Sequence, residues 1–255
     1  MPEGPSLVLL QEAAAGFAGK TIVRAHGLAK IDMARLTGKR IVALRTWGKH
    51  FLIQLPDVTV RVHLLLFGSY RINGHKDTRP TLGLTFDDGE LNFYTGSVRL
   101  IEGMLDDTYD WRADVLSDQW DPAAARRKLR THPDMLVCDA LLDQTVFAGV
   151  GNIIKNEVLF RIRVHPLSAV GALPERKLRE LVEQARAYSF DFLAWKRHDE
   201  LKQHWLAHTK QVCPRCHIPF RKGLLGKTKR RSFYCERCQK KYVQQSQPDL
   251  WTDQA

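Results

Sequence analysis

The chain contains two Cys-x2-Cys pairs, Cys213-Pro-Arg-Cys216 and Cys235-Glu-Arg-Cys238, which are separated by 18 residues. Such pairs let four thiolates converge on one tetrahedral Zn²⁺, because each pair supplies two ligands from one tight turn. The four cysteines are therefore predicted to bind one structural zinc ion and to staple a short β-hairpin. Two disulfides would leave the fifth cysteine, Cys138, without a partner, and Cys138 is expected to be a buried structural residue.

The predicted zinc hairpin also holds the densest positive charge in the chain. Residues 210–241 contain eleven lysines and arginines and one acid, Glu236, while the whole chain has a net charge of +11 and a pI near 9.6. A metal-stapled hairpin this basic is typical of a nucleic-acid-binding module. A hairpin that only stabilises the fold or binds another protein is the alternative.

The composition indicates a globular protein. Apolar residues make up 44% of the chain and charged residues 26%, and no run approaches the roughly 20 consecutive apolar residues of a membrane helix. The N-terminus, Met1-Pro-Glu-Gly-Pro5, has no basic region followed by an apolar run, so no signal peptide is expected. We therefore expect a cytoplasmic protein, nucleoid-associated if it is bacterial, with no membrane partner.

The fold class expected is a multidomain α+β protein. Its N-terminal part alternates apolar and polar residues in short runs separated by turn residues, which predicts an antiparallel β-sandwich flanked by a helix over residues 7–17. The strands are expected at Thr21–Ala25, Arg40–Thr46, Phe51–Leu55, Thr59–Leu64, Gly83–Phe86 and Glu90–Tyr94.

Helical periodicity begins at Asp121, which can cap a helix that has Pro122 at its first position. The predicted domains are the β-sandwich at 1–115, a helical domain at 121–208, the zinc finger at 209–243 and a loosely ordered tail at 244–255.

The second residue, Pro2, is a candidate nucleophile. A small second residue usually permits removal of Met1, which would leave Pro2 as a secondary amine with a pKa well below the ~10.4 of lysine. Such an amine can attack an aldehyde-like sugar carbon and form an iminium. Glu3 is placed next to it to move protons. A frayed terminus without function is the alternative.

Three internal segments carry further candidates. Lys49 lies near the tip of a predicted hairpin, where a solvated charge is the ordinary interpretation. The run Val62-His63-Leu64-Leu65-Leu66-Phe67-Gly68 is more apolar than a one-sided strand needs, and one of its side chains could wedge into a base stack. The segment 141–160 is expected to form helix, glycine turn and helix. Asn152 begins the second helix, where free N–H groups can bind a phosphate. A glycine turn that serves only the geometry of the connection is the alternative.

Together these residues resemble the formamidopyrimidine-DNA glycosylase/endonuclease VIII family of base-excision repair enzymes. The resemblance covers nearly the whole chain in family order. It runs through Met1–Pro5, Trp47-Gly-Lys49, His63–Gly68, Leu141–Asn152 and the hairpin ending Arg230-Arg-Ser-Phe-Tyr-Cys235-Glu-Arg-Cys238-Gln239.

The resemblance implies a helix–two-turn–helix DNA-binding domain and a role for each matched residue. Pro2 would attack C1′ of a flipped, damaged nucleotide, and Glu3 would act as general acid/base. Lys49 would contact the phosphate beside the lesion and assist the chemistry. The DNA-binding positions are Asn152, Arg230, His63 and Leu66, with Arg230 placed five residues before Cys235 as in the family. The implied reaction is base release followed by β,δ-elimination. The resemblance also implies a monomer that binds damaged DNA and needs no cofactor beyond structural zinc.

The chain departs from the family in three places. Ser6 stands where a second glutamate is common. The interval between the cysteine pairs is longer than usual. The glycine- and threonine-rich stretch of enzymes dedicated to oxidised purines is replaced by Tyr188–Lys196 and His204-Trp205. The last departure favours the endonuclease VIII-like branch, with oxidised pyrimidines as substrates and Leu66 as the void-filling wedge.

Two functions from other classes stay open on the sequence. A catalytically silent protein on the same fold would bind damaged or bent DNA without cutting it. A zinc-ribbon RNA-binding or translation factor would explain the basic hairpin but leave Pro2, Glu3 and Lys49 without a role.

Overall fold

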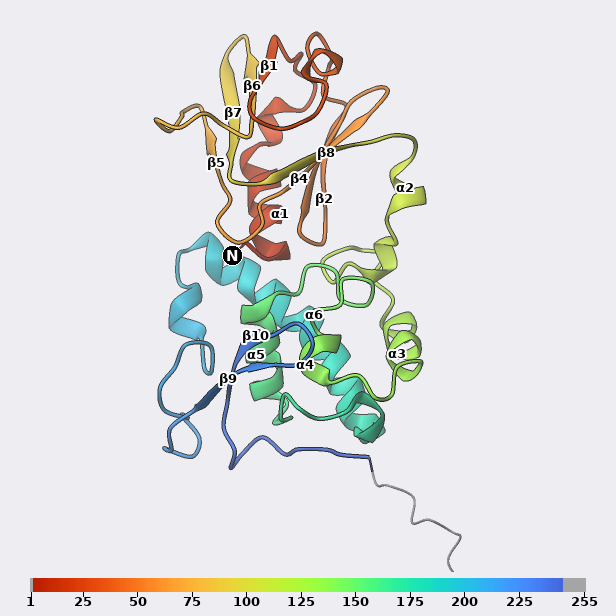
Figure 1. Cartoon of the computed structure of the whole chain (residues 1–255), viewed down its shortest axis with the longest axis vertical. Helices are drawn as coiled ribbons and strands as arrows, with labels where there is room; N and C mark the ends of the chain where they lie inside the picture. The colour runs from red at the N-terminus through yellow and green to blue at the C-terminus, as the bar shows by residue number, and fades with distance from the viewer. Residues whose placement is uncertain (1, 245–255) are drawn as a thin grey trace, which may run out of the picture.

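The structure is a computed structural model that describes residues 2–244 of the 255 (Figure 1). The predicted tail beyond residue 244 and the predicted removal of Met1 lie outside these residues. Within the described part, no helix is both long enough and apolar enough to cross a membrane. The predicted domain boundaries stay predictions.

The N-terminal part consists of two four-stranded antiparallel sheets and one long helix, as the alternating pattern predicts. The sheets have the strand orders β1-β6-β7-β5 and β2-β3-β4-β8. Leu7 and Leu10 of the helix α1 share one core with Phe51 and Phe93 from the two sheets. The elements are α1 (Gly4–Ala13), β1 (Arg24–His26), β2 (Ala43–Trp47), β3 (His50–Gln54), β4 (Thr59–His63), β5 (Ser69–Ile72), β6 (Leu82–Phe86), β7 (Gly89–Tyr94) and β8 (Ser97–Ile101).

The sequence pattern missed two strands and misplaced the start of the first helix. β5 and β8 follow Gly68 and Gly96 closely, and each is half-polar, so neither shows the apolar alternation that identified the other strands. Helix α1 begins at Gly4 rather than Leu7, with Pro5 in its first turn, where its missing N–H costs nothing. Because the helix begins at Gly4, whose N–H donates to the carbonyl oxygen of Gly149, Pro2 and Glu3 are held close to the C-terminal half of the protein.

The C-terminal half is helical and then forms the hairpin. Asp121 caps its helix as predicted, since its Oδ1 accepts hydrogen bonds from the N–H groups of Ala123 and Ala124 at 2.8 and 2.9 Å. The elements are α2 (Leu105–Thr108), α3 (Pro122–Arg130), α4 (Val137–Ala140), α5 (Asn152–Arg161), α6 (Glu175–Arg197), β9 (Arg221–Leu225) and β10 (Arg230–Tyr234). Short 3-10 turns lie at Ala15–Phe17, Met33–Arg35, Trp111–Ala113, Val170–Ala172 and Leu201–His204.

The segment 141–160 differs from its prediction in its first half. The helix α4 ends at Ala140, and turns occupy residues 141–151 before α5 begins at Asn152, as predicted. Helix α5 is buried almost all round, because it contacts both α6 and β10. Figure 1 shows it enclosed between α6 and the hairpin. This position lets α5 join the hairpin to the body of the protein.

Two buried carboxylates tie the C-terminal segments together. Asp139 of α4 accepts hydrogen bonds from the N–H groups of Lys227 and Thr228 in the hairpin turn, at 2.9 and 3.0 Å. Glu157 of α5 is fully buried and accepts the N–H groups of residues 206–208 at 2.7 to 3.1 Å. Each carboxylate therefore satisfies several backbone donors of a segment that lies about 50 to 90 residues away in the chain.

The variant Glu157→Ala is expected to destabilise the fold by about 3 kcal/mol, because the N–H groups at residues 206–208 lose their buried acceptor. Urea unfolding followed by tryptophan fluorescence measures this loss. The matched control is Glu183→Ala, which removes an exposed glutamate from α6 and should change the unfolding free energy by less than about 0.5 kcal/mol. Equal unfolding midpoints for the two variants would contradict the assigned role of Glu157.

Candidate active site

Glu3 is the most deeply buried acid of the predicted site. Its side chain has no exposed surface, and its carboxylate accepts hydrogen bonds from the N–H groups of Gly151, Ile153 and Ile154 at 3.1, 2.7 and 3.2 Å. Burial raises the pKa of Glu3, although the nearby Lys49 and the three N–H donors act against that rise. Glu3 is therefore held rigidly at the start of α5 and can exchange a proton closer to neutral pH than an exposed glutamate.

This arrangement corrects one expectation about the glycine turn. Of the two interpretations, a phosphate site and a turn that serves geometry, the second fits the structure: the N–H groups at the start of α5 bind the carboxylate of Glu3, which the positive end of the helix dipole also favours. The two glycines, Gly149 and Gly151, allow this turn to pack closely against the residues at the N-terminus. The N–H of Gly4 donates to the carbonyl oxygen of Gly149 at 2.9 Å, and a Cβ on Gly151 would lie 2.3 Å from the Glu3 carboxyl carbon.

Lys49 lies in the two-residue turn between β2 and β3, as predicted. Gly48 precedes it with a φ of +54°, and its N–H donates to the buried carboxylate of Asp114 at 2.8 Å. Burial lowers the pKa of Lys49; Glu3 opposes the shift and Arg230 adds to it. The amine of Lys49 is thus less firmly protonated than that of an exposed lysine.

Four predicted residues line one cavity of about 550 Å³: Lys49, His63, Leu66 and Arg230. Its wall also includes the neighbours of Leu66 in the loop after β4. In this loop Leu65 has a φ of +52°, and Phe67 is 83% exposed. Apolar side chains held outward beside two cations are unusual on a protein surface and indicate a contact with another molecule.

Pro2 lies in a second cavity, of about 700 Å³, with Ser6, Tyr70, Arg71 and Lys196 on its wall. The loop of residues 64–68 separates the two cavities, since Leu64 and Gly68 line the second while Leu65, Leu66 and Phe67 line the first. Pro2 and Lys49 therefore do not share a cavity. They are linked through Glu3, which follows Pro2 in the chain and interacts electrostatically with Lys49.

His63, which lines the same cavity as Lys49, belongs to a small aromatic group. Its ring meets that of His50 edge-on at 5.2 Å between centroids, and Nδ1 of His50 is hydrogen-bonded to the Tyr109 hydroxyl at 3.1 Å. Burial lowers the pKa of His50 to about 3 and also lowers the pKa of His63. Near neutral pH the neutral forms of both imidazoles are therefore favoured.

Asn152 and the hairpin meet at one carbonyl oxygen. The Asn152 side-chain amide donates to the carbonyl oxygen of Arg231 at 3.0 Å, and its Oδ1 is buried without a hydrogen-bond partner. Arg230, rather than the adjacent Arg231, lines the Lys49 cavity, while Arg231 is exposed. Asn152 itself does not line that cavity, so the structure brings it to the hairpin and not to Lys49.

Sequence reasoning missed Lys155 and Asn156, which meet the same hairpin strand. Asn156 donates to the Arg231 carbonyl oxygen at 3.2 Å and accepts the N–H of Phe233 at 3.1 Å. A lysine and an asparagine in a helix ordinarily face solvent, so the residue types themselves do not mark these two as buried. The apolar run of α5 on both sides of them was the available signal.

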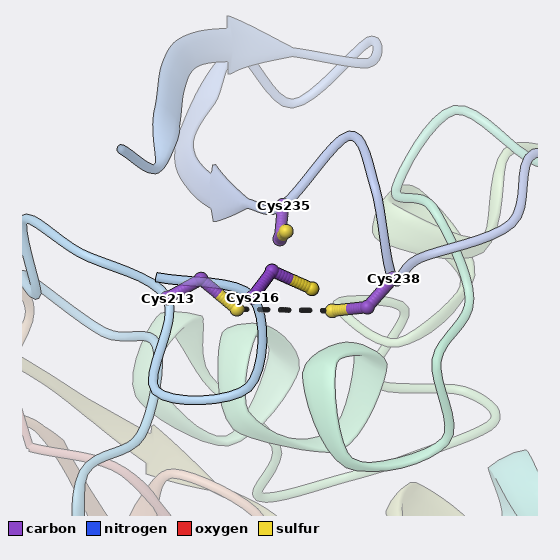
Figure 2. A group of neighbouring side chains, drawn as sticks. All are labelled: Cys213, Cys216, Cys235 and Cys238. Atoms are coloured by element: carbon purple, nitrogen blue, oxygen red, sulfur yellow. Dashed lines mark hydrogen bonds between the residues drawn. The ribbon is translucent and has the colours of Figure 1, made fainter. Parts of the chain in front are cut away.

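The four cysteines converge from two loops, as Figure 2 shows. All four Sγ atoms lie within 4.8 Å of one another, and those of Cys213 and Cys238 are 3.8 Å apart. Tetrahedral sulfurs at a Zn–S bond length of about 2.3 Å are about 3.8 Å apart. The donor set therefore fits one tetrahedral metal ion. Cys138 is buried away from it, as predicted, and burial raises the pKa of its thiol to about 11.

The fold and the site define a class of helix–two-turn–helix proteins in which the chain's N-terminus and a four-cysteine hairpin meet on one helix. Two family models match the chain: the formamidopyrimidine-DNA glycosylase N-terminal domain at residues 1–100 and the formamidopyrimidine-DNA glycosylase H2TH domain at residues 113–188.

Known relatives agree with these models. Endonuclease 8 2 of Mycobacterium tuberculosis is 32% identical over 66% of this chain and 70% of its own length. Formamidopyrimidine-DNA glycosylase of Carboxydothermus hydrogenoformans is 32% identical over 73% and 75%. The chain belongs to the formamidopyrimidine-DNA glycosylase/endonuclease VIII family. Endonuclease 8-like 3 of Xenopus laevis is 29% identical over 86% of this chain, which spans 38% of that protein's length.

The fold has close counterparts among solved structures. Lactococcus lactis formamidopyrimidine-DNA glycosylase, non-covalently bound to DNA containing an abasic (AP) site, superimposes with a TM-score of 0.83 over 94% of this chain and 100% of that chain. At 22% sequence identity the likeness shows the fold. It confirms the predicted combination of antiparallel sheets, helix–two-turn–helix region and cysteine-rich hairpin.

The purified protein is expected to contain one tightly bound metal ion per chain, and Cys235→Ser is expected to lose it, because three thiolates leave a tetrahedral site incomplete. Atomic emission measures the metal content, and faster hydrogen exchange in β9 and β10 reports the loosened hairpin. Cys138→Ala, which removes the cysteine outside the cluster, should keep a full complement. Metal retained by Cys235→Ser would contradict the four-thiolate site.

Proposed function

We propose that this protein is a bifunctional DNA glycosylase and AP lyase, which removes oxidised bases, chiefly pyrimidines, and then nicks the strand by β,δ-elimination. The observation that carries the proposal is the position of Glu3. This acid is buried at the start of α5 and interacts with Lys49, while Pro2 before it faces an open cavity. A proton-transfer group is thereby fixed between a candidate amine nucleophile and a cationic cavity.

The proposed chemistry begins at the nitrogen of Pro2, once Met1 has been removed. Its lone pair attacks C1′ of the flipped nucleotide, the bond from C1′ to the base breaks, and the base leaves with a proton. The proton that the Pro2 nitrogen releases is the one that the departing base takes up. The C1′–O4′ bond then opens with formation of the iminium, and O4′ takes a proton from the protonated carboxyl group of Glu3. Loss of a C2′ proton then expels the 3′ phosphate, and a second elimination expels the 5′ phosphate.

The two cavities suggest where the parts of the DNA would bind. The damaged base would enter the cavity of Pro2, whose wall includes Ser6 and Tyr70. Lys49, Arg230 and Asn152 would contact the flanking phosphates, which supplies the salt-dependent part of the affinity. Leu66, 47% exposed at the rim of the other cavity, would fill the space that the flipped nucleotide vacates.

The preference for oxidised pyrimidines is supported by the helix α6. It runs without a break from Glu175 to Arg197, so the segment Tyr188–Lys196 is helical where purine-specific enzymes are expected to have a glycine- and threonine-rich stretch. The names of several relatives, endonuclease 8 and endonuclease 8-like, agree with this branch.

The metal proposed for the cysteine cluster is zinc, since four thiolates in a closed tetrahedral set are typical of structural zinc sites. It would supply no step of the reaction and would hold Arg230 in place through the hairpin. The protein is further proposed to act as a cytoplasmic monomer without a small-molecule cofactor.

Borohydride trapping tests the nucleophile. Untagged protein mixed with an oligonucleotide containing an abasic site should give a covalent adduct, and mass mapping should locate it on Pro2, since reduction fixes the iminium. An N-terminal extension, which converts the Pro2 nitrogen to an amide, should abolish the adduct. The same extension at the C-terminus is the matched control. An adduct on Lys49 would show that Lys49, and not Pro2, is the nucleophile. DNA binding without any adduct would favour a catalytically silent protein that only binds damaged DNA.

Gly151→Ala tests the placement of Glu3. The added Cβ would meet the Glu3 carboxyl group at 2.3 Å, so Glu3 must leave the start of α5. Strand cleavage at a pre-formed abasic site is expected to fall roughly 100-fold or more, as for loss of a general acid/base. Gly16→Ala, where a Cβ meets nothing within 4 Å, should cleave normally. Full activity in Gly151→Ala would exclude the assigned role of the Glu3 position.

A further inference from the structure

Lys155 on α5 is a buried cation in an unexpected place. Its side chain has no exposed surface, and its ammonium donates to Ser232 Oγ at 2.9 Å and to the carbonyl oxygen of Arg231 at 3.2 Å. Both acceptors are uncharged. Burying a charge against neutral oxygens is costly, and a leucine or methionine would ordinarily serve better in a helix core. Such a residue therefore calls for an explanation beyond packing.

Lys155 shares one acceptor, the carbonyl oxygen of Arg231, with other side chains of α5, and Arg231 directly follows Arg230 in the chain. The carbonyl oxygen of Arg231 receives hydrogen bonds from Asn152, Lys155 and Asn156, three side chains of one helix. An oxygen that accepts three donors is held in a single orientation, and the strand β10 around it is fixed with it. Since Arg230 directly precedes this peptide and lines the Lys49 cavity, the direction of its side chain depends on that anchor.

We propose that Lys155 is a positioning residue, which anchors β10 so that Arg230 meets the phosphate of bound DNA and whose own charge strengthens that binding. The inference rests on the proposed function, because it needs DNA as the ligand of the Arg230 cavity. Lys155 would not touch the DNA. Its ammonium would act through the peptide of Arg231 and through the electrostatic potential at the cavity.

The surroundings of Lys155 give this role a pH dependence. The charged and titratable groups that face it are Glu3 before α1, Cys138 and Asp139 on α4, Arg230 on β10, and His208 after the turn at 201–204. Burial, and after it Arg230, lowers the pKa of Lys155 to about 8, while Cys138, Glu3 and Asp139 oppose the shift.

The sign of the effect follows from the charge of the ligand. Lys155 carries its proton below about pH 8 and loses it above. A bound phosphate favours the protonated form, so the affinity for DNA is highest below that pH and declines as the pH rises through it. Cys138 and His208, with pKa values of about 11 and about 4, titrate outside this interval.

The test is equilibrium binding of the untagged full chain to a duplex containing tetrahydrofuran, an abasic-site analogue that undergoes no elimination, between pH 6 and 9.5. Relative to wild type, Lys155→Met is expected to bind roughly tenfold more weakly at pH 7, as for loss of one charge-assisted hydrogen bond. Its decline in affinity around pH 8 should also be smaller than that of the wild type, since only the other cations of the site, such as Lys49, still lose their protons. Lys30→Met, at an exposed position in the N-terminal half, is the matched control and should follow the wild-type profile.

A second variant guards against misfolding of the first. Ser232→Ala removes one acceptor of the ammonium, which should move the alkaline decline to lower pH while metal content stays unchanged. If Lys155→Met loses its metal, the profile of Ser232→Ala decides. Wild-type affinity and an unshifted profile in the correctly folded variants would overturn the inference. Failure of the wild type itself to bind the analogue would instead overturn the proposed function.

Discussion

The carboxylate of Glu3 at the start of α5 is the interaction on which the site depends. Three backbone N–H groups of one helix turn hold it in the protein interior. The N-terminus is consequently fixed against a helix that lies about 150 residues further along the chain. The contact requires glycine at positions 4 and 151, because a Cβ at either would collide with the other side of the junction. A terminus that is ordinarily free to fray thus becomes part of a site.

Helix α5 combines three further tasks, each carried by a different residue type. Asn152 and Asn156 hold the hairpin through one carbonyl oxygen, and Glu157 organises the loop that leads to the first cysteine pair. The four-cysteine cluster joins the other end of that loop to the hairpin. Phe160 packs against Cys213 and Cys235 in one small core. The geometry of the cationic cavity therefore depends both on the burial of α5 and on the four-cysteine cluster, and a change in either would alter the position of Arg230.

Burial decides the chemistry of the site as much as proximity does. Glu3 and Lys155 are fully buried and Lys49 is half-buried. Glu3 interacts electrostatically with both lysines, and burial shifts the pKa of each of the three groups toward its neutral form. Groups with such perturbed pKa values cluster at functional sites, because proton transfer and anion binding both profit from them. Burial also raises the pKa of Cys138 and of Asp114, but neither residue lines one of the two cavities. A shifted pKa therefore identifies a functional residue only together with its position.

The sequence by itself determined the four-cysteine hairpin, the sandwich, the capped helix at Asp121 and the turn that carries Lys49, since each rests on local spacing or a turn residue. It also identified the residues Lys49, His63, Leu66 and Arg230, which the fold brings into one cavity. Only the tertiary structure decided that Glu3 occupies the N–H groups expected for a phosphate, that Pro2 faces a separate cavity, and that Lys155 is buried. These three facts arise from contacts between segments up to about 150 residues apart. Local patterns of polarity carry no record of such contacts, because a buried lysine and a solvated one look alike in a sequence.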